Sequence, residues 1–184
     1  MIVRLFSARR RMAAPPIGAV VHAMGEFVRV GARIVPAWDW LEESGLSVHA
    51  LIYSNGDVLR GCTDADVAYH AGKSRWADGR EGCNLFTLGA EFLVAGDHDY
   101  PSLLARMAAP DCYTEEQLEA GAALYAEWAA RCGFGPDAIV GHSDVAGDDV
   151  RGEDQGKRDP GAGFPWERFR GLIASAPVRA GPLE

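Results

Sequence analysis

Two short segments in the last third of the chain carry residues that could hold a metal ion. In residues 139–144 (IVGHSD), an apolar pair leads through glycine to His142, which predicts an imidazole at the end of a strand. In residues 157–161 (KRDPG), Asp159 directly precedes a Pro-Gly turn. A histidine nitrogen and a carboxylate oxygen are two of the three protein ligands of a catalytic zinc site, where water takes the fourth position. The alternative is that His142 caps a loop and Asp159 is an ordinary turn residue.

Three further histidines are candidates for the missing ligand. His22 ends the apolar run of residues 18–22, which has the pattern of a short buried strand. His49 lies in another apolar segment, and His70 lies in a loop of small residues that would let the backbone approach a ligand. The alternatives are that His22 is a hydrogen-bonded core histidine and that His70 caps its loop.

Glu91 is the one carboxylate in residues 84–94, a segment with the pattern of a buried central strand. Burying a carboxylate is costly unless it is paired or lies near a metal ion. We therefore predict a functional role for Glu91.

Local patterns predict alternating strands and helices. An Asn-Gly pair at 55–56 between the apolar runs 46–53 and 58–62 predicts a β-hairpin. Thr114, with Gln117 three residues later, is typical of a capping box that begins a helix. The other predictions are an edge strand over 2–6, a helical stretch ending at Gly45, a short helix over 102–107, an end of the Thr114 helix at 132–133, a solvated acidic loop over 147–155 and a last helix from 164 to about 174.

The composition is that of one globular domain. The chain has 184 residues, of which 48% are hydrophobic and 24% charged, and no apolar run approaches the roughly 18 residues of a membrane span. A net charge of −8 argues against a nucleic-acid partner, because phosphate binding needs a basic face. Residues 1–11 are basic, but residues 12–16 interrupt the apolar core that a signal peptide would need, so we expect no Sec-type export.

The four cysteines form no CxxC pair, which argues against a zinc knuckle and a thioredoxin-type motif. We expect most of them to be reduced and structural. A bridge between Cys112 and Cys132 stays open, because the sequence does not establish its geometry.

Seven short segments, in their order along the chain, resemble the zinc-dependent N-acetylmuramoyl-L-alanine amidases of the AmpD, phage-lysozyme and peptidoglycan-recognition superfamily. The resemblance covers about residues 20–169. It implies an α/β fold: a single domain with a central mixed β-sheet flanked by helices, and zinc in a groove at the strand ends. We accordingly expect a lead-in at 1–17, an amidase domain at 18–175 and a C-terminal tail at 176–184. The seven segments are residues 20–22 (VVH), 47–49 (SVH) with the hairpin at 55–56, 69–72 (YHAG), 83–84 (CN), 88–91 (LGAE), 140–144 (VGHSD) and 157–161 (KRDPG).

Carried over position by position, the resemblance implies a complete catalytic site. His22, His142 and Asp159 would bind Zn²⁺. Glu91 would take a proton from the attacking water and return it to the leaving amine, and Lys157 would stabilise the developing oxyanion. The bond cut would join the lactyl carbonyl of N-acetylmuramic acid to the L-alanine of the stem peptide. The resemblance assigns the floor and wall of the substrate cleft to four more residues: His49, His70, Ala71 and Asn84.

Four positions depart from the family pattern. Ala23 and Ala50 stand where many relatives carry an aromatic or polar residue, which indicates a wider or differently lined cleft. Gly82 and Gly156 stand where the cytosolic enzymes that recycle anhydro-muropeptides typically carry arginines that grip the substrate. These two glycines favour a phage-type endolysin, or another lytic amidase, that degrades cell-wall peptidoglycan.

Three other functions stay open. A cytosolic recycling amidase would cut the same bond in a soluble muropeptide. A non-catalytic peptidoglycan-binding module would not need the metal ligands, so the intact set of His22, His142 and Asp159 argues against it. A regulator that binds another protein through this fold would show no recognisable motif in a single sequence. We expect a monomer, made in the cytoplasm, that acts at the cell wall if it is lytic and in the cytosol if it recycles muropeptides.

Overall fold

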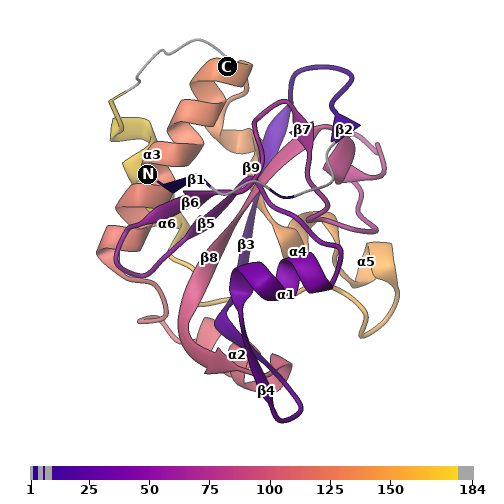
Figure 1. Cartoon of the computed structure of the whole chain (residues 1–184). Coiled ribbons are helices and arrows are strands. Elements are labelled where there is room, and N and C mark those ends of the chain that lie inside the picture. The colour runs from indigo at the N-terminus through magenta and orange to yellow at the C-terminus, as the bar shows by residue number, and fades with distance from the viewer. Residues whose placement is uncertain (1, 4–5, 7–9, 178–184) are drawn as a thin grey trace.

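A mixed β-sheet forms the centre of the computed structural model, which describes residues 2–3, 6 and 10–177 (Figure 1). Within these residues the main sheet has seven strands in the order β1-β6-β5-β8-β3-β4, with β9 also paired to β3. The pairs β3–β8, β3–β9, β5–β8 and β1–β6 are parallel, and β3–β4 and β5–β6 are antiparallel. The strands are β1 (Ile2–Val3), β3 (Gly18–Val30), β4 (Arg33–Pro36), β5 (Ala50–Ile52), β6 (Val58–Arg60), β8 (Thr87–His98) and β9 (Ile139–Gly141), and β2 (Arg10–Arg11) pairs with β7 (Asp66–Val67) in a second small sheet.

Helices cover both faces of the main sheet, with α3 and α6 on one side and α1 on the other (Figure 1). Side chains alternate between the two faces of a strand, so β3 contributes side chains to the cores on both faces of the sheet. Val21 and Ala23 belong to the core under α3 and α6, whereas Met24 belongs to the core under α1. His22 therefore lies on the α1 face. The helices are α1 (Ala37–Glu43), α2 (Tyr100–Met107), α3 (Glu115–Cys132), α4 (His142–Val145), α5 (Asp148–Arg151) and α6 (Trp166–Ser175), with 3₁₀ turns η1 (Cys83–Leu85) and η2 (Pro136–Ala138).

Helix α3 packs on the sheet and approaches it closely at Gly121. A Cβ at Gly121 would lie 2.4 Å from the Phe92 ring, so glycine is what allows this approach. Tyr125 is fully buried and donates a hydrogen bond to the carbonyl of Val20 at 2.8 Å. Burying an aromatic side chain of this size contributes roughly 1.5–3 kcal/mol to folding. This packing fixes β3 and β8, which carry His22 and Glu91.

The strongest local predictions are confirmed. The Asn-Gly turn joins β5 to β6, and α3 begins at Glu115 after the Thr114 cap, whose side chain accepts from the backbone N–H of Gln117. The second half of the predicted capping box does not form. The Gln117 side chain instead donates to the carbonyls of Ile52 and Leu93 in two strands of the sheet.

Other elements differ from the predictions. The strand that carries His22 continues to Val30 and turns back into β4, whereas the sequence pattern indicates a more helical stretch after Glu26. The acidic segment 147–155, predicted as a solvated loop, contains the helical turn α5. Asp149 of α5 pairs with Arg75 at 2.7 Å, and the Asp148 side chain accepts from the backbone N–H of Gly156 at 2.8 Å. These contacts to neighbouring loops order the segment.

Parts of the expected lead-in pack against the domain. Ile2–Val3 pairs with β6, Arg10–Arg11 pairs with β7, and the Phe6 ring stacks on Trp38 of α1 with centroids 4.0 Å apart. Most of the expected tail, residues 178–184, lies outside the described residues, as do residues 1, 4–5 and 7–9 of the lead-in.

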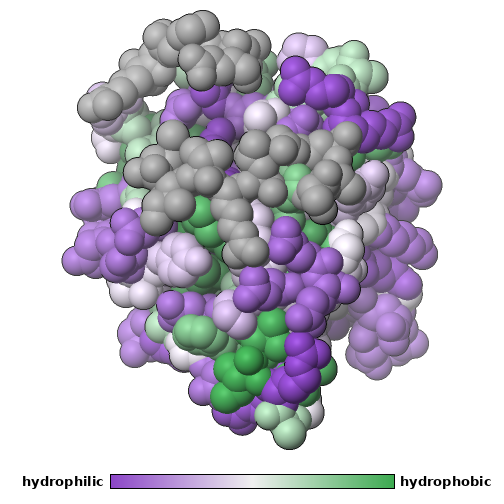
Figure 2. All heavy atoms as spheres, viewed as in Figure 1, coloured by the Kyte–Doolittle hydropathy of each residue, from purple (hydrophilic) through white to green (hydrophobic). Residues whose placement is uncertain are grey.

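All four cysteines are free, so the bridge between Cys112 and Cys132 is not formed. Among the residues described, no helix is both long enough and apolar enough to cross a membrane. Figure 2 shows a mostly hydrophilic face with a hydrophobic surface patch at its lower end, where Figure 1 places the β3–β4 hairpin. The exposed apolar residues of that hairpin are Phe27, Val30 and Ile34.

Candidate metal centre

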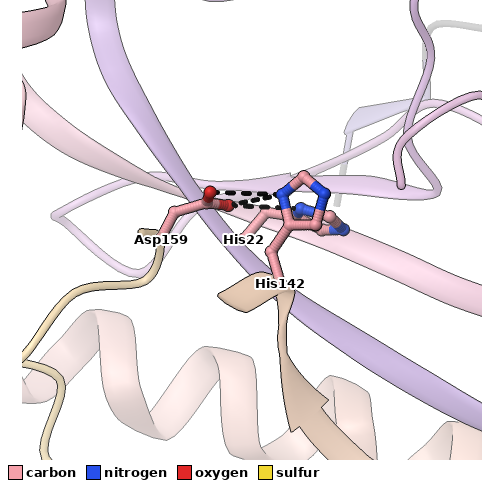
Figure 3. Close-up of side chains that lie close together, drawn as sticks. All are labelled: His22, His142 and Asp159. Carbon is pink, nitrogen blue, oxygen red and sulfur yellow. Dashed lines mark hydrogen bonds and ion pairs between the residues drawn. The ribbon is translucent and has the colours of Figure 1, made fainter. Parts of the chain in front are cut away.

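The side chains of His22, His142 and Asp159 point toward one another, as Figure 3 shows. The Nδ1 atom of His22 lies 3.3 Å from Oδ2 of Asp159, and Nδ1 of His142 lies 3.0 Å from the same oxygen. The two imidazole rings meet edge to face with centroids 4.3 Å apart. Both histidines are buried, and the Asp159 side chain is 14% exposed. One carboxylate therefore faces two imidazole nitrogens in a largely buried site.

Three different elements deliver these side chains. His22 lies within β3, and His142 is the first residue of α4, directly after β9. Because β9 pairs with β3 in register at Val21 and Gly141, the two histidines emerge side by side. Asp159 comes from the loop after α5, and its carbonyl accepts a hydrogen bond from the backbone N–H of Ser143 at 3.0 Å.

This donor set fits a zinc ion. Two imidazole nitrogens and one carboxylate oxygen are a ligand combination found in catalytic zinc sites. Ligands about 2.0–2.1 Å from a tetrahedral ion lie about 3.3 Å from one another. The separations of 3.0 and 3.3 Å from Asp159 to the two Nδ1 atoms match that spacing.

The remaining ring nitrogens have protein partners, which leaves Nδ1 of each histidine for the metal. Nε2 of His22 lies 2.8 Å from Nδ1 of His70, and Nε2 of His142 lies 3.3 Å from the carbonyl oxygen of Ala71. A metal-binding histidine usually donates its other N–H to such a partner, which fixes its tautomer.

Burial and mutual contact shift the pKa values of His22 and Asp159. Burial lowers the pKa of His22 to about 4, with His142 nearby acting in the same direction, so the imidazole is neutral at pH 7. Burial by itself raises the pKa of Asp159, but the facing imidazoles of His142 and His22 outweigh it, and the net direction is down. The site therefore offers the neutral imidazole of His22 and the ionised carboxylate of Asp159, the forms that bind a metal.

Glu91 lies beside this cluster. It is directly opposite His22 in the parallel register of β3 and β8, and it is 9% exposed. Its Oε2 atom is buried and has no hydrogen-bond partner. Burial raises the pKa of the Glu91 carboxyl well above its usual value, and the Asp159 carboxylate adds to that shift. A buried carboxyl oxygen without a partner is costly, which indicates a group held for a ligand or for a proton.

Lys157 contributes positive charge at the same place. Its charge acts to lower the pKa of both Glu91 and His22, and the side chain is only partly exposed. Its backbone N–H bonds the carbonyl of Ala146 at 2.8 Å, which ties the Lys157 loop to the end of α4.

Of the four predicted cleft residues, His49, His70 and Ala71 are buried and Asn84 is partly exposed. His49 is fully buried; Nε2 lies 3.0 Å from the carbonyl of Asp66, and Nδ1 accepts from the backbone N–H of Gly89 at 3.0 Å. The His49 imidazole thereby joins a loop to β8, and its assignment to the substrate cleft stays a prediction. His70 contacts His22, Ala71 contacts His142, and the Asn84 side chain accepts hydrogen bonds from the backbone N–H groups of His70 and Ala71.

Two residues at the site carry no local sequence signal. Arg151 of α5 donates to the carbonyl of Ala71 at 2.9 Å, the same oxygen that faces His142. The Tyr113 hydroxyl donates to the carbonyl of Pro160, next to Asp159, at 2.5 Å. Both contacts join segments that are far apart in the chain, so only the fold reveals them.

The two glycines at the expected arginine positions have clear structural reasons. Gly82 has φ +73°, a left-handed conformation that favours glycine. A Cβ at Gly156 would lie 2.4 Å from the backbone nitrogen of Asp148, so no side chain fits there. The α5 segment occupies the space around position 156.

His49 makes the stability of the metal-free protein depend on pH. Burial lowers the pKa of His49 to about 4, below the 6.5 of an unfolded histidine, so between pH 6.5 and pH 4 the unfolded chain binds the extra proton. The free energy of unfolding should fall as the pH drops through this window, with His49 contributing roughly 3 kcal/mol. Urea unfolding of chelator-treated protein at several pH values would measure this. His49→Gln should lose part of the slope, and an unchanged slope would contradict this role of His49.

Comparison with known proteins agrees with the family expected from the motifs. The sequence model of the family described as N-acetylmuramoyl-L-alanine amidase matches residues 12–162. Over 131 residues the chain is 32% identical to the 1,6-anhydro-N-acetylmuramyl-L-alanine amidase AmpD of Enterobacter cloacae. The match covers 71% of this chain and 59% of that relative, so it spans about three fifths of the relative's length.

Solved structures share the fold. The crystal structure of a selenomethionine derivative of AmpD matches with a TM-score of 0.70 and 23% identity, over 94% of this chain and 93% of that chain. The amidase AmiD from E. coli, solved with the substrate anhydro-N-acetylmuramic acid-L-Ala-D-gamma-Glu-L-Lys, matches with a TM-score of 0.56 and 21% identity, over 89% and 60%. The predicted α/β fold, a single domain with a central mixed sheet flanked by helices, is confirmed.

Proposed function

The chain belongs to the N-acetylmuramoyl-L-alanine amidase family, and we propose that it is a zinc-dependent hydrolase of the amide bond between an N-acetylmuramyl group and L-alanine. The observation that carries this proposal is the convergence of His22, His142 and Asp159 beside the unpaired carboxyl oxygen of Glu91. Two imidazoles and one carboxylate would leave a bound Zn²⁺ with a net positive charge, which would supply Lewis-acid activation of water and of the amide carbonyl.

Glu91 and Lys157 would carry out the proton and charge steps. Glu91, directly opposite His22, takes a proton from the attacking water and returns it to the nitrogen of L-alanine as the C–N bond breaks. Lys157 donates to the carbonyl oxygen as negative charge develops on it, an effect often worth roughly 3 kcal/mol for one well-placed donor. The products are the muramyl carboxylic acid and a stem peptide with a free N-terminal amine.

The substrate we propose is a soluble 1,6-anhydro-muropeptide. The support is the identity of 32% to AmpD of Enterobacter cloacae, whose name specifies the anhydro sugar. This substrate would place the reaction in the cytosol, as part of cell-wall recycling. The sequence motifs alone favoured a lytic enzyme, and the comparison with curated relatives favours the recycling alternative.

A lytic amidase that degrades intact peptidoglycan is the second candidate. It is favoured by Gly82 and Gly156, which leave the site without the two arginines expected of a recycling enzyme. Arg151 and Lys157 still supply positive charge near the metal centre, so the site remains charged without those two arginines.

A comparison of two substrates decides between these candidates. The rate of L-alanyl peptide release would be measured per susceptible bond on anhydro-N-acetylmuramic acid-L-Ala-γ-D-Glu-L-Lys and on purified sacculi. We expect the soluble substrate to be favoured in kcat/KM by on the order of tenfold or more, about 1.4 kcal/mol of transition-state binding. Faster release from sacculi would contradict the recycling proposal and support the lytic one.

A further inference from the structure

We propose that His70, Ala71 and Asn84 form a clamp that sets the tautomer and orientation of both histidine ligands. This inference rests on the zinc site of the proposed function and concerns how the protein holds that site. The clamp consists of the His70 ring, the Ala71 carbonyl and the Asn84 side chain, and it acts from behind the metal centre.

Asn84 fixes the backbone of the clamp. Its Oδ1 atom accepts the backbone N–H of His70 at 3.0 Å and that of Ala71 at 2.7 Å. A side-chain carbonyl oxygen has two lone pairs, so one asparagine satisfies both donors. The turn η1 that carries Asn84 is itself held in place, because Thr87 Oγ1 donates to the carbonyl of Cys83 at 2.7 Å.

His70 orients His22 through an ordered series of hydrogen bonds. Nε2 of His70 faces the carbonyl of Thr87 at 3.4 Å and can only donate to it. A neutral His70 protonated on Nε2 has an accepting Nδ1, which lies 2.8 Å from Nε2 of His22. His22 must then carry its proton on Nε2, and its Nδ1 lone pair faces Asp159.

Ala71 orients His142 in the same way. The Ala71 carbonyl lies 3.3 Å from Nε2 of His142, and a carbonyl can only accept, so His142 also carries its proton on Nε2. Nδ1 of His142 then offers its lone pair toward Asp159. Arg151 donates to the same carbonyl at 2.9 Å and holds it in place from the other side.

Contacts within the protein hold the residues of the clamp in place. Both nitrogens of His70 are engaged, and its ring lies against the backbone of Gly89, where a Cβ would be 2.5 Å from Nδ1. Ala71 is fully buried. His70, Ala71 and Asn84 are therefore positioning residues, and their effect on the reaction passes through the metal ligands.

Loss of the clamp should weaken zinc binding. Without it, each imidazole can rotate or place its proton on Nδ1, and a protonated Nδ1 cannot bind a metal. Outer-shell partners of this kind typically change metal affinity by about 10–100-fold. We expect such a loss in His70→Leu, which removes the acceptor for His22, and in Asn84→Ala, which releases the backbone N–H groups of residues 70 and 71.

The test is zinc affinity, measured by competition with a chelator of known affinity. His70→Asn is the conservative variant, because its Oδ1 can replace the accepting Nδ1, and it should keep most of the affinity. Ser47→Ala is the matched control: Ser47 Oγ accepts the backbone N–H of Tyr69 at 2.8 Å, in the same segment but outside the clamp. We expect Ser47→Ala to lower the melting temperature while zinc affinity stays near that of the wild type.

The outcomes separate this inference from the proposed function. Wild-type protein that binds no zinc would overturn the proposed function itself. Wild-type protein that binds zinc, with His70→Leu and Asn84→Ala binding it equally tightly, would overturn only the clamp. If Asn84→Ala does not fold, the pair His70→Leu and His70→Asn decides: equal affinities overturn the inference, and a loss in the leucine variant alone supports it.

Discussion

Glu91→Gln is expected to lower the rate of amide hydrolysis by about 10²- to 10⁴-fold while zinc stays bound. Glutamine has nearly the same shape as glutamate but cannot take the proton of the attacking water. Because Oε2 of Glu91 is buried without a partner, the neutral amide should not destabilise the fold, and the melting temperature should stay equal or rise. Peptide release from an anhydro-muropeptide and zinc content, measured on the same preparation, check both parts.

The matched control for this variant is Glu119→Gln, the same chemical change on the exposed face of α3. It should hydrolyse the substrate at the wild-type rate. A Glu91→Gln protein that holds zinc and remains as active as Glu119→Gln would show that another group handles the proton.

Asp159→Ala should remove the metal and the activity together. The Asp159 carboxylate lies 3.0–3.3 Å from Nδ1 of both histidines, so its loss takes away one of three ligands and the charge that balances the ion. We expect zinc affinity to fall by more than the roughly 10–100-fold that outer-shell changes cause. Elemental analysis and chelator competition would measure the loss.

Asp144→Asn provides the control for this second variant. Asp144 lies on α4, two residues after His142, and its Oδ2 accepts the backbone N–H of Gly141 at 2.7 Å. An asparagine oxygen can keep that bond, so this variant should retain one zinc per chain. Full zinc content in Asp159→Ala would contradict the assignment of Asp159 as a ligand.

Elements with strong local signals could be predicted from the sequence. The Asn-Gly pair at 55–56 has a strong local preference for a tight hairpin turn, and Thr114 supplies the cap that starts α3. The apolar run before His142 likewise placed that histidine at a strand end, which β9 confirms.

Elements that depend on distant partners could not be predicted. The segment after His22 forms a strand because β8 and β4 pair with it, although glycine and glutamate interrupt its apolar pattern. The turn α5 is ordered by Arg75 and Gly156, which lie outside it. Such contacts override weak local propensity, and they cannot be predicted from the local sequence.

The candidate site could likewise be predicted only in part from the sequence. The residue types of His22, His142, Asp159 and Glu91 suggested metal and proton chemistry, and the family resemblance supplied their roles. The sequence did not indicate that His49 would be buried between backbone groups, or that a backbone carbonyl of Ala71 would face His142. Backbone partners have no sequence signature, so only the fold could reveal them.

Mass spectrometry can identify the products that the zinc-loaded protein forms from anhydro-N-acetylmuramic acid-L-Ala-γ-D-Glu-L-Lys, which tests the proposed amidase activity directly. We expect two products: free anhydro-N-acetylmuramic acid and a tripeptide with L-alanine at its N-terminus. An unchanged substrate, or cleavage at a peptide bond inside the stem, would contradict the proposed activity.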